Sequence, residues 1–152
     1  MKITRIDKAG IDLIKYFEGF RSKPYLCPSS VATIGYGSTR MPNGQKVTLM
    51  DREISEAEAE SFLQHDLKYF ESAVDALATD LVNQNQFSAL VSFCYNVGQE
   101  NLKSSTLLKK VNKDPNDPSI KEEFKKWVYG KGVKLEGLVT RRAAEAALYF
   151  KK

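Results

Sequence analysis

The sequence predicts an α+β fold that is mainly helical, with one small antiparallel sheet. Apolar residues recur at helical spacing before residue 20 and again after residue 55. Between them lies a short stretch rich in β-branched and aromatic residues, bounded by turn formers. The 152 residues suffice for one globular domain with a real core. We therefore expect a single domain over residues 1–152, with a small β lobe at about 20–50 and a helical lobe at about 55–152 plus the N-terminal helix.

The first predicted helix begins after Asp7, whose carboxylate can accept a hydrogen bond from a free amide of the first turn. Ile11, Ile14 and Glu18 are spaced i, i+3 and i+7, so they share one face. Gly19 suits the left-handed conformation that commonly ends a helix. A carboxylate therefore closes an apolar stripe at the last turn, which is an unusual place for a glutamate whose only role is solubility.

The predicted sheet has its first strand within Val31–Gly37, where β-branched and aromatic residues concentrate. The turn formers Pro28-Ser29-Ser30 precede this stretch, and Met41-Pro42-Asn43-Gly44 follows it. We expect the second strand near Gln45–Thr48. The lobe is too small to carry a large core of its own, and a cleft beside the helical body is the expected ligand site.

Five further helices are predicted from capping patterns and apolar spacing. The first starts at Ser55-Glu56-Ala57-Glu58, and the second starts at Asn83 with Gln86 and ends at Gly98. The third is expected at Ser105–Val111, and the last at about Leu138–Phe150. The fourth starts at Ser119 with Glu122 and carries Phe124 and Trp127. A solvated loop at residues 113–118 separates two of them.

The composition is that of an ordinary globular protein, with 42% hydrophobic and 28% charged residues and a formal net charge of +4. The basic excess favours encounter with anionic polymers. The two cysteines, Cys27 and Cys94, form neither a disulfide scaffold nor a zinc ribbon. A disulfide between them is an alternative only if the chain reaches an oxidising compartment. No apolar run is long enough for a signal peptide or a membrane span, so we expect a cytoplasmic protein without stable membrane insertion.

The stretch from Glu18 to Gly37 carries the most specific signal. Eight residues separate Glu18 from Cys27 and five separate Cys27 from Thr33, within the surrounding motifs Glu-Gly-Phe-Arg and Thr-Ile-Gly-Tyr-Gly. This stretch resembles the catalytic segment of phage-type lysozymes, glycoside hydrolase family 24, whose pattern is Glu, then Asp or Cys, then Thr at this spacing. Residues 86–98, 104–108 and 137–145 resemble the family in the same order.

The resemblance implies a lysozyme-like fold and an endolysin that cleaves the β-1,4 bond between N-acetylmuramic acid and N-acetylglucosamine in bacterial peptidoglycan. Glu18 would then protonate the glycosidic oxygen as general acid. Such an acid needs surroundings that disfavour its charged form, and both an apolar face and the negative helix terminus act in that direction. In the family an arginine near the last helix pairs with this glutamate, and Arg142 is the candidate, with Arg141 next. The alternative for Glu18 is a solvated helix end.

Cys27 stands where other members of the family carry Asp. A carboxylate there could orient or deprotonate the attacking water, whereas a neutral thiol is a poorer base. A thiolate could substitute if the pocket lowers the thiol pKa, and the alternative is a small packed thiol. Thr33 offers a hydroxyl that can hold water on the far face of the sugar, although strand propensity alone also explains a threonine.

The resemblance also assigns Tyr25, Tyr95, Asn96 and Arg142 to substrate binding. Aromatic faces suit sugar rings, and an amide can address N-acetyl groups. Arg142 with Glu145 at i, i+3 equally fits a simple surface pair. Ser38 departs from the family, which often has His after Gly-Tyr-Gly.

The histidine and the basic residues argue against several other classes of protein. His65 is the only histidine, which argues against a zinc amidase or endopeptidase and leaves a Cys–His peptidase little support. Basic residues occur as scattered pairs without interleaved aromatics, so nucleic-acid binding is discounted. A lytic transglycosylase and a non-catalytic wall-binding protein remain open. We expect a monomer that needs no metal or organic cofactor and that reaches the periplasmic wall through a separate holin.

Overall fold

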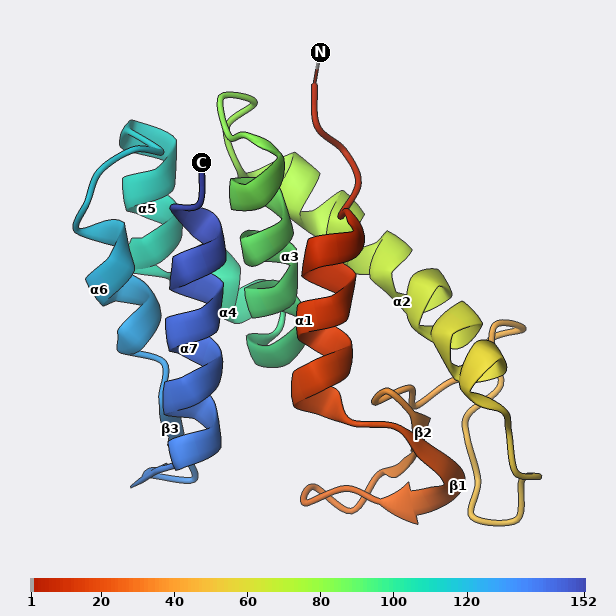
Figure 1. Ribbon diagram of the computed structural model, residues 1–152. Coiled ribbons are helices and arrows are strands. Elements are labelled where there is room, and N and C mark those ends of the chain that lie inside the picture. The colour runs from red at the N-terminus through yellow and green to blue at the C-terminus, as the bar shows by residue number, and fades with distance from the viewer. Residues whose placement is uncertain (1) are drawn as a thin grey trace. The chain divides into compact units, whose positions relative to one another are not determined.

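The computed structural model describes residues 2–152, which form two compact units (Figure 1). The helical unit comprises the described residues up to Leu13 together with Phe70–Lys152, and the β-containing unit comprises Ile14–Tyr69. The boundaries between the units fall within α1 (Lys8–Glu18) and α2 (Glu56–Leu77). Helices dominate and two small antiparallel ladders accompany them, which confirms the predicted α+β class. Among residues 2–152, no helix combines the length and apolar character needed to cross a membrane.

Both ends of α1 follow the predicted signals. The Asp7 carboxylate accepts a hydrogen bond from the Gly10 amide at 3.2 Å. Gly19 has φ +73°, and its amide donates to the Lys15 carbonyl at 3.0 Å. Because this left-handed turn stops the helix directly after Glu18, the carboxylate lies at the C-terminal end of α1.

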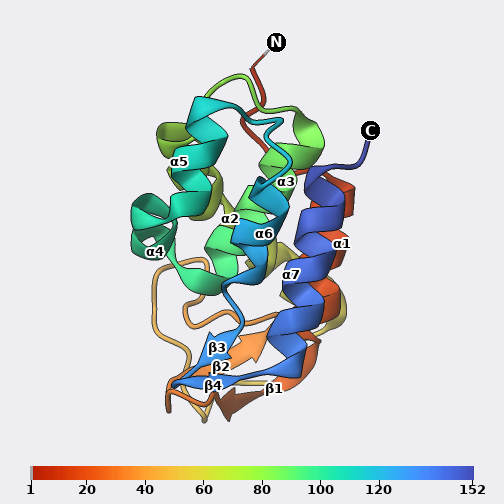
Figure 2. The same cartoon turned by 90° about the vertical axis from the view of Figure 1, so that its left-hand side faces the viewer.

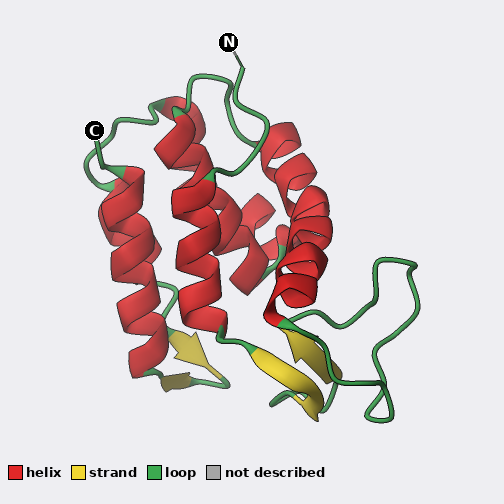
Figure 3. Cartoon of the chain, turned by 45° about the vertical axis from the view of Figure 1, so that its right-hand side comes forward, coloured by secondary structure: helices red, strands yellow, loops and turns green. Residues whose placement is uncertain are grey.

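The sheet of the β-containing unit corrects the predicted strand pairing. β1 (Arg21–Leu26) pairs antiparallel with β2 (Ala32–Gly35), so the partner strand precedes β2 and the predicted second strand near Gln45–Thr48 is wrong. That segment makes only an isolated bridge, between Arg40 and Lys46. β1 was missed because its sequence is polar and contains Pro24, which gives no alternating pattern. Figure 3 shows the short strands and the long loop that follows them.

The helix α2 begins with the capping box that the sequence predicts. The Glu58 amide donates to the Ser55 hydroxyl at 3.1 Å, and the Ser55 amide donates to the Glu58 carboxylate at 3.3 Å. Its buried side chains in the β-containing unit are Ala59, Leu63 and Leu67. Ile34 of β2 and Ile54 of the loop before α2 are buried in the same unit.

The helical unit is built around α3 (Gln84–Val97), in which every residue from Gln86 to Cys94 is buried. Asn83 and Gln86 form the predicted capping box at its start. α3 packs against α7 (Glu136–Tyr149), and α7 in turn packs against α6 (Ile120–Lys125) (Figures 1 and 2). A ladder of aromatic rings joins these helices, with centroid separations of 5.6 Å at Phe93–Phe124, Phe93–Trp127 and Phe124–Tyr149.

Two helices and one hairpin of the helical unit differ from expectation. α4 (Gln99–Ser104) was not predicted, whereas α5 (Thr106–Lys113) starts at Ser105 as expected. α6 ends before Trp127, and the chain then forms a hairpin of β3 (Tyr129–Gly130) and β4 (Val133–Lys134) that leads into α7. A hairpin this short leaves no alternating pattern in the sequence.

Candidate active site

The predicted catalytic residues all lie in the β-containing unit. Glu18 is half-buried at the end of α1, Cys27 directly follows β1, and Thr33 lies on β2. The sheet register places Thr33 opposite Tyr25, two residues before Cys27. The short connection between the strands therefore brings the Cys27 and Thr33 side chains to the same end of the ladder.

A tight turn holds the Cys27 side chain. The Ser30 amide donates to the Cys27 carbonyl at 2.8 Å, and the Cys27 amide donates to the Val31 carbonyl at 3.0 Å. Ser30 has φ +63°, in the left-handed region. The turn places the Ser29 hydroxyl 2.9 Å from the Cys27 sulfur.

The surroundings of Cys27 favour the thiolate. Hydrogen bonds from the Ser29 hydroxyl, and then from the backbone amides of Val31 and Ser29, lower the pKa of Cys27 to about 7. The Thr33 hydroxyl contributes in the same direction, and its oxygen also lies 2.9 Å from the Val31 carbonyl, to which it donates. Because this pKa lies near neutral pH, a large share of the thiol is ionised there and can accept a proton from water.

Tyr25 lies near three charged groups of this site, which are Arg21, Glu18 and Cys27. Its ring is covered on one face by the Arg21 guanidinium, whose central carbon lies 4.2 Å from the ring centroid. Burial raises the pKa of Tyr25, and the negative charges of Glu18 and Cys27 add to this effect while Arg21 opposes it. Glu18 and Cys27 therefore both lie close enough to Tyr25 to act on it electrostatically.

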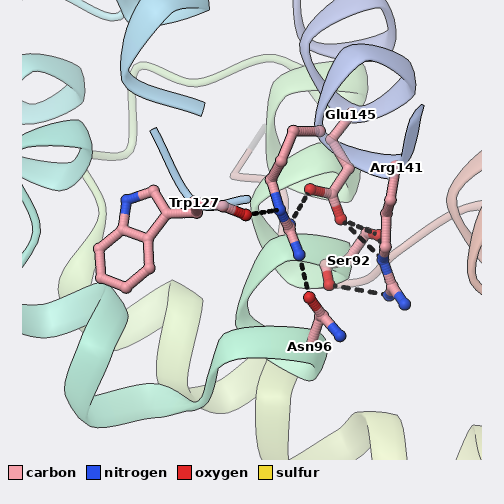
Figure 4. Close-up of polar contacts among 6 residues, drawn as sticks. Ser92, Asn96, Trp127, Arg141 and Glu145 are labelled. Carbon is pink, nitrogen blue, oxygen red and sulfur yellow. Dashed lines mark hydrogen bonds and ion pairs between the residues drawn. The ribbon is translucent and has the colours of Figure 1, made fainter. Parts of the chain in front are cut away.

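The predicted substrate-binding residues of the helical unit form a second group. Arg142 is fully buried and forms an ion pair with Glu145 (Figure 4). Its guanidinium also donates to the side-chain oxygen of Asn96 and, from Nε, to the Trp127 carbonyl at 3.0 Å. The surface pair that the i, i+3 spacing allowed is therefore wrong, since both partners are excluded from water.

Glu145 is shared between two arginines and a serine. Its Oε2 accepts from the Ser92 hydroxyl at 2.6 Å and from Arg141 Nε at 3.2 Å. Burial raises the pKa of Glu145, whereas the Arg142 and Arg141 guanidinium groups and the Ser92 hydroxyl hold it down. The result is a polar network inside an otherwise apolar helical core, with Asn96 as its exposed end.

Tyr95 directly precedes Asn96 and is half-buried on α3. Its ring packs edge-to-face on Phe70, with centroids 5.1 Å apart. This contact packs the Tyr95 ring against α2 within the helical unit.

Several supporting residues were missed from the sequence. Ser29 and Arg21 flank predicted residues, but only the turn and the strand pairing show that their side chains touch Cys27 and Tyr25. Ser92 had a visible signal, because it is a hydroxyl within the apolar stretch of α3. Such a buried group needs a hydrogen-bond partner, which Glu145 and Arg141 supply.

The described residues 2–152 contain no group of three or more His, Cys, Asp or Glu side chains arranged to hold a metal ion. Both cysteines are free thiols. His65 is exposed on α2, as predicted.

Comparison with known proteins gives a consistent picture. The phage lysozyme family model matches residues 15–145. An endolysin of Bacillus phage B103 is 44% identical over 147 residues, and an endolysin of Acyrthosiphon pisum secondary endosymbiont phage 1 is 36% identical over 148 residues. Each alignment covers 95% of this chain, which spans 54% of the length of the first relative and 97% of the second. The solved structure of an endolysin from Escherichia coli O157:H7 phage FAHEc1 has a TM-score of 0.87 and 35% identity, over 96% of this chain and 93% of that one.

Proposed function

Because the chain belongs to the phage lysozyme family, we propose that it is an endolysin that hydrolyses bacterial peptidoglycan. The bond cleaved is the β-1,4 linkage between N-acetylmuramic acid and N-acetylglucosamine, and its hydrolysis lyses the host cell. The observation that carries the chemistry is the Cys27 thiol, 2.9 Å from the Ser29 hydroxyl and in the same unit as Glu18 and Thr33.

Glu18 is the proposed general acid. It would give its proton to the glycosidic oxygen as the bond to the anomeric carbon breaks. Its half-buried place at the C-terminal end of α1, in the unit that also holds Cys27 and Thr33, supports this role. Glu18→Gln keeps the shape of the side chain and removes the proton, so it is the matched inactive variant.

Cys27 and Thr33 are proposed to activate and hold the attacking water. In an inverting hydrolysis a base removes a proton from water on the face opposite the leaving group. The Cys27 thiolate can take this proton near neutral pH, and the Thr33 oxygen, whose own proton is donated to the Val31 carbonyl, can accept a hydrogen bond from the same water. This assigns to a thiolate the work that a carboxylate does in other members of the family.

Tyr25, Tyr95 and Asn96 are proposed to bind the glycan strand, and Arg142 is proposed to support that binding through Asn96. The Tyr25 ring, held by Arg21, offers an aromatic surface to a sugar ring. The Asn96 amide can address an N-acetyl group. Since Arg142 is fully buried and donates to the Asn96 oxygen, we assign it to the orientation of that amide.

The proposal also covers the oligomeric state of the protein, its cofactors and its route to the cell wall. The protein acts as a monomer without metal or organic cofactor. A cytoplasmic pool gains access to the wall in the periplasm when a separate holin opens the membrane. Lysis of cells that express this chain with and without a holin tests this dependence, because lysis without the holin would contradict it.

The direct test is mass spectrometry of the soluble fragments released from purified peptidoglycan, with Glu18→Gln in parallel. Fragments with reducing N-acetylmuramic acid ends from the wild type alone would support a lysozyme that acts through Glu18. Ends in the 1,6-anhydro form would instead indicate a lytic transglycosylase. No fragments from a folded sample would indicate a wall-binding protein without catalysis.

A further inference from the structure

The face of the helical unit between α6 and α7 carries two adjoining pockets, of about 440 Å³ and about 540 Å³. They share Lys125 and Ala143 in their linings, so they adjoin, and we call the two pockets together the groove. Every lining residue lies between Pro118 and Phe150, within the helical unit. None of these residues takes part in the proposed reaction. Pockets of this size accommodate small molecules.

The floor of the groove is apolar. α7 contributes Val139, Ala143, Ala146 and Ala147, which recur at helical spacing and so lie on one face of the helix. Ala143 and Ala147 are exposed to solvent. Small side chains between two packed helices leave a furrow that an extended hydrocarbon chain can fill.

The rim of the groove is basic. Lys121 and Lys125 border the first pocket, and Lys134 borders the second. Within residues 2–152 none of these three lysines has a carboxylate partner, and no acidic residue lines either pocket. Lys126 differs, since its ammonium group lies 3.0 Å from the buried Glu123 carboxylate. The groove therefore combines apolar walls with uncompensated positive charge.

The β3–β4 hairpin contributes Tyr129 and Lys134 to the second pocket and carries further exposed apolar surface. Tyr129 and Val133 are 64% and 61% exposed, although exposing large apolar side chains to water does not stabilise the fold. The hairpin turns at Lys131 and Gly132, with φ of +51° and +80°. It joins α6 to α7 in the chain (Figure 2). Exposed aromatic and aliphatic side chains beside lysines are typical of segments that enter the interface of an anionic membrane.

We propose that this face of the helical unit binds anionic phospholipid at a membrane surface. One acyl chain occupies the alanine-lined groove, the phosphate lies against Lys121, Lys125 and Lys134, and the hairpin side chains enter the interface. A wall polyanion or an acidic peptide would use the lysines but leave the apolar floor unfilled, so the lipid accounts for both features. The inference does not rest on the proposed hydrolase function, because it uses no residue of that site.

The test is co-sedimentation of the full chain with vesicles of phosphatidylglycerol and, separately, of phosphatidylcholine. We expect binding to the anionic vesicles only. Each lysine near an anionic surface contributes about 1 kcal/mol, so Lys121→Gln with Lys125→Gln should weaken binding about thirtyfold. The matched control replaces two exposed lysines of the same unit outside the groove, Lys103→Gln with Lys109→Gln, and should have a much smaller effect. Equal losses in the two double variants would overturn the groove as the site.

A second variant tests the apolar floor. Ala147→Glu places a carboxylate in the groove and should abolish binding, whereas Ala9→Glu, in the first turn of α1, should not. Circular dichroism confirms that each variant is folded. Unchanged binding of the Ala147→Glu protein, or displacement from vesicles by polyglutamate at equal charge, would overturn the lipid assignment. Hydrolysis of purified peptidoglycan by the lysine variants should be unchanged, which separates this proposal from the proposed function.

Discussion

The Ser29 hydroxyl lies 2.9 Å from the Cys27 sulfur and is the largest cause of the low pKa of that thiol. The hydroxyl can donate to the thiolate, so it stabilises the charged form. The contact spans only two residues, within a turn that Ser30 closes with a left-handed backbone. Ser29, which is not part of the family pattern, thus influences the protonation of Cys27, which is part of it.

Replacing Ser29 with alanine should raise the pKa of Cys27 from about 7 toward its ordinary value, by about one unit. The thiolate fraction at neutral pH should fall, and the acid limb of the activity profile should move to higher pH by the same amount. Thiolate absorbance against pH measures the first effect directly. Cys94 does not interfere, because burial raises its pKa to about 11. An unchanged titration of Cys27 would show that Ser29 is not the controlling donor.

Cys27→Asp should retain most activity and should extend it to lower pH, because a carboxylate ionises well below a thiol. Cys27→Ala together with Thr33→Ala should lose most activity, since neither group that we assign to the water remains. The measurement is the rate of release of reducing ends from purified peptidoglycan between about pH 4 and pH 9, a range that brackets both ordinary pKa values. Full activity of the double alanine variant would remove the water-positioning role from both residues.

The sequence predicted those parts of the fold that depend on local chemistry. The Asp7 cap, the left-handed Gly19 and the two capping boxes all occur as expected, because each requires only residues within four positions of one another. The pairing of β1 with β2 could not be predicted in the same way. It depends on a strand that contains Pro24 and whose register is irregular between Arg21 and Tyr25.

The same limit applies to the candidate site. The family pattern pointed to Cys27 and Thr33, but their place at the same end of one ladder depends on the pairing of β1 with β2, which the sequence did not predict. The burial of Arg142 and Glu145 could not be seen from their spacing, which suits an exposed pair as well. Only the packing of α7 on α3 shows that Ser92 completes their hydrogen bonding.

Glu145→Ala should destabilise the fold by about 3–5 kcal/mol, because it leaves two buried guanidinium groups without their shared carboxylate. Urea unfolding followed by circular dichroism measures the change. The control is Glu122→Ala on the exposed face of α6, which should change the free energy of unfolding by less than about 0.5 kcal/mol. Similar values for the two variants would show that the buried network contributes nothing to stability.

Ser38→Ala should destabilise the fold by about 1–3 kcal/mol, because the Ser38 hydroxyl donates to the Asp66 carboxylate at 2.6 Å. Burial raises the pKa of Asp66 and this hydrogen bond opposes the rise, so the variant should raise that pKa further. A carboxyl group with a raised pKa in the folded state makes stability fall as pH increases above its unfolded value. The loss caused by Ser38→Ala should therefore be larger at neutral pH than at about pH 4, where Asp66 is closer to its protonated form. Urea unfolding at both pH values measures this, and an equal loss at each would show that Ser38 acts by packing alone.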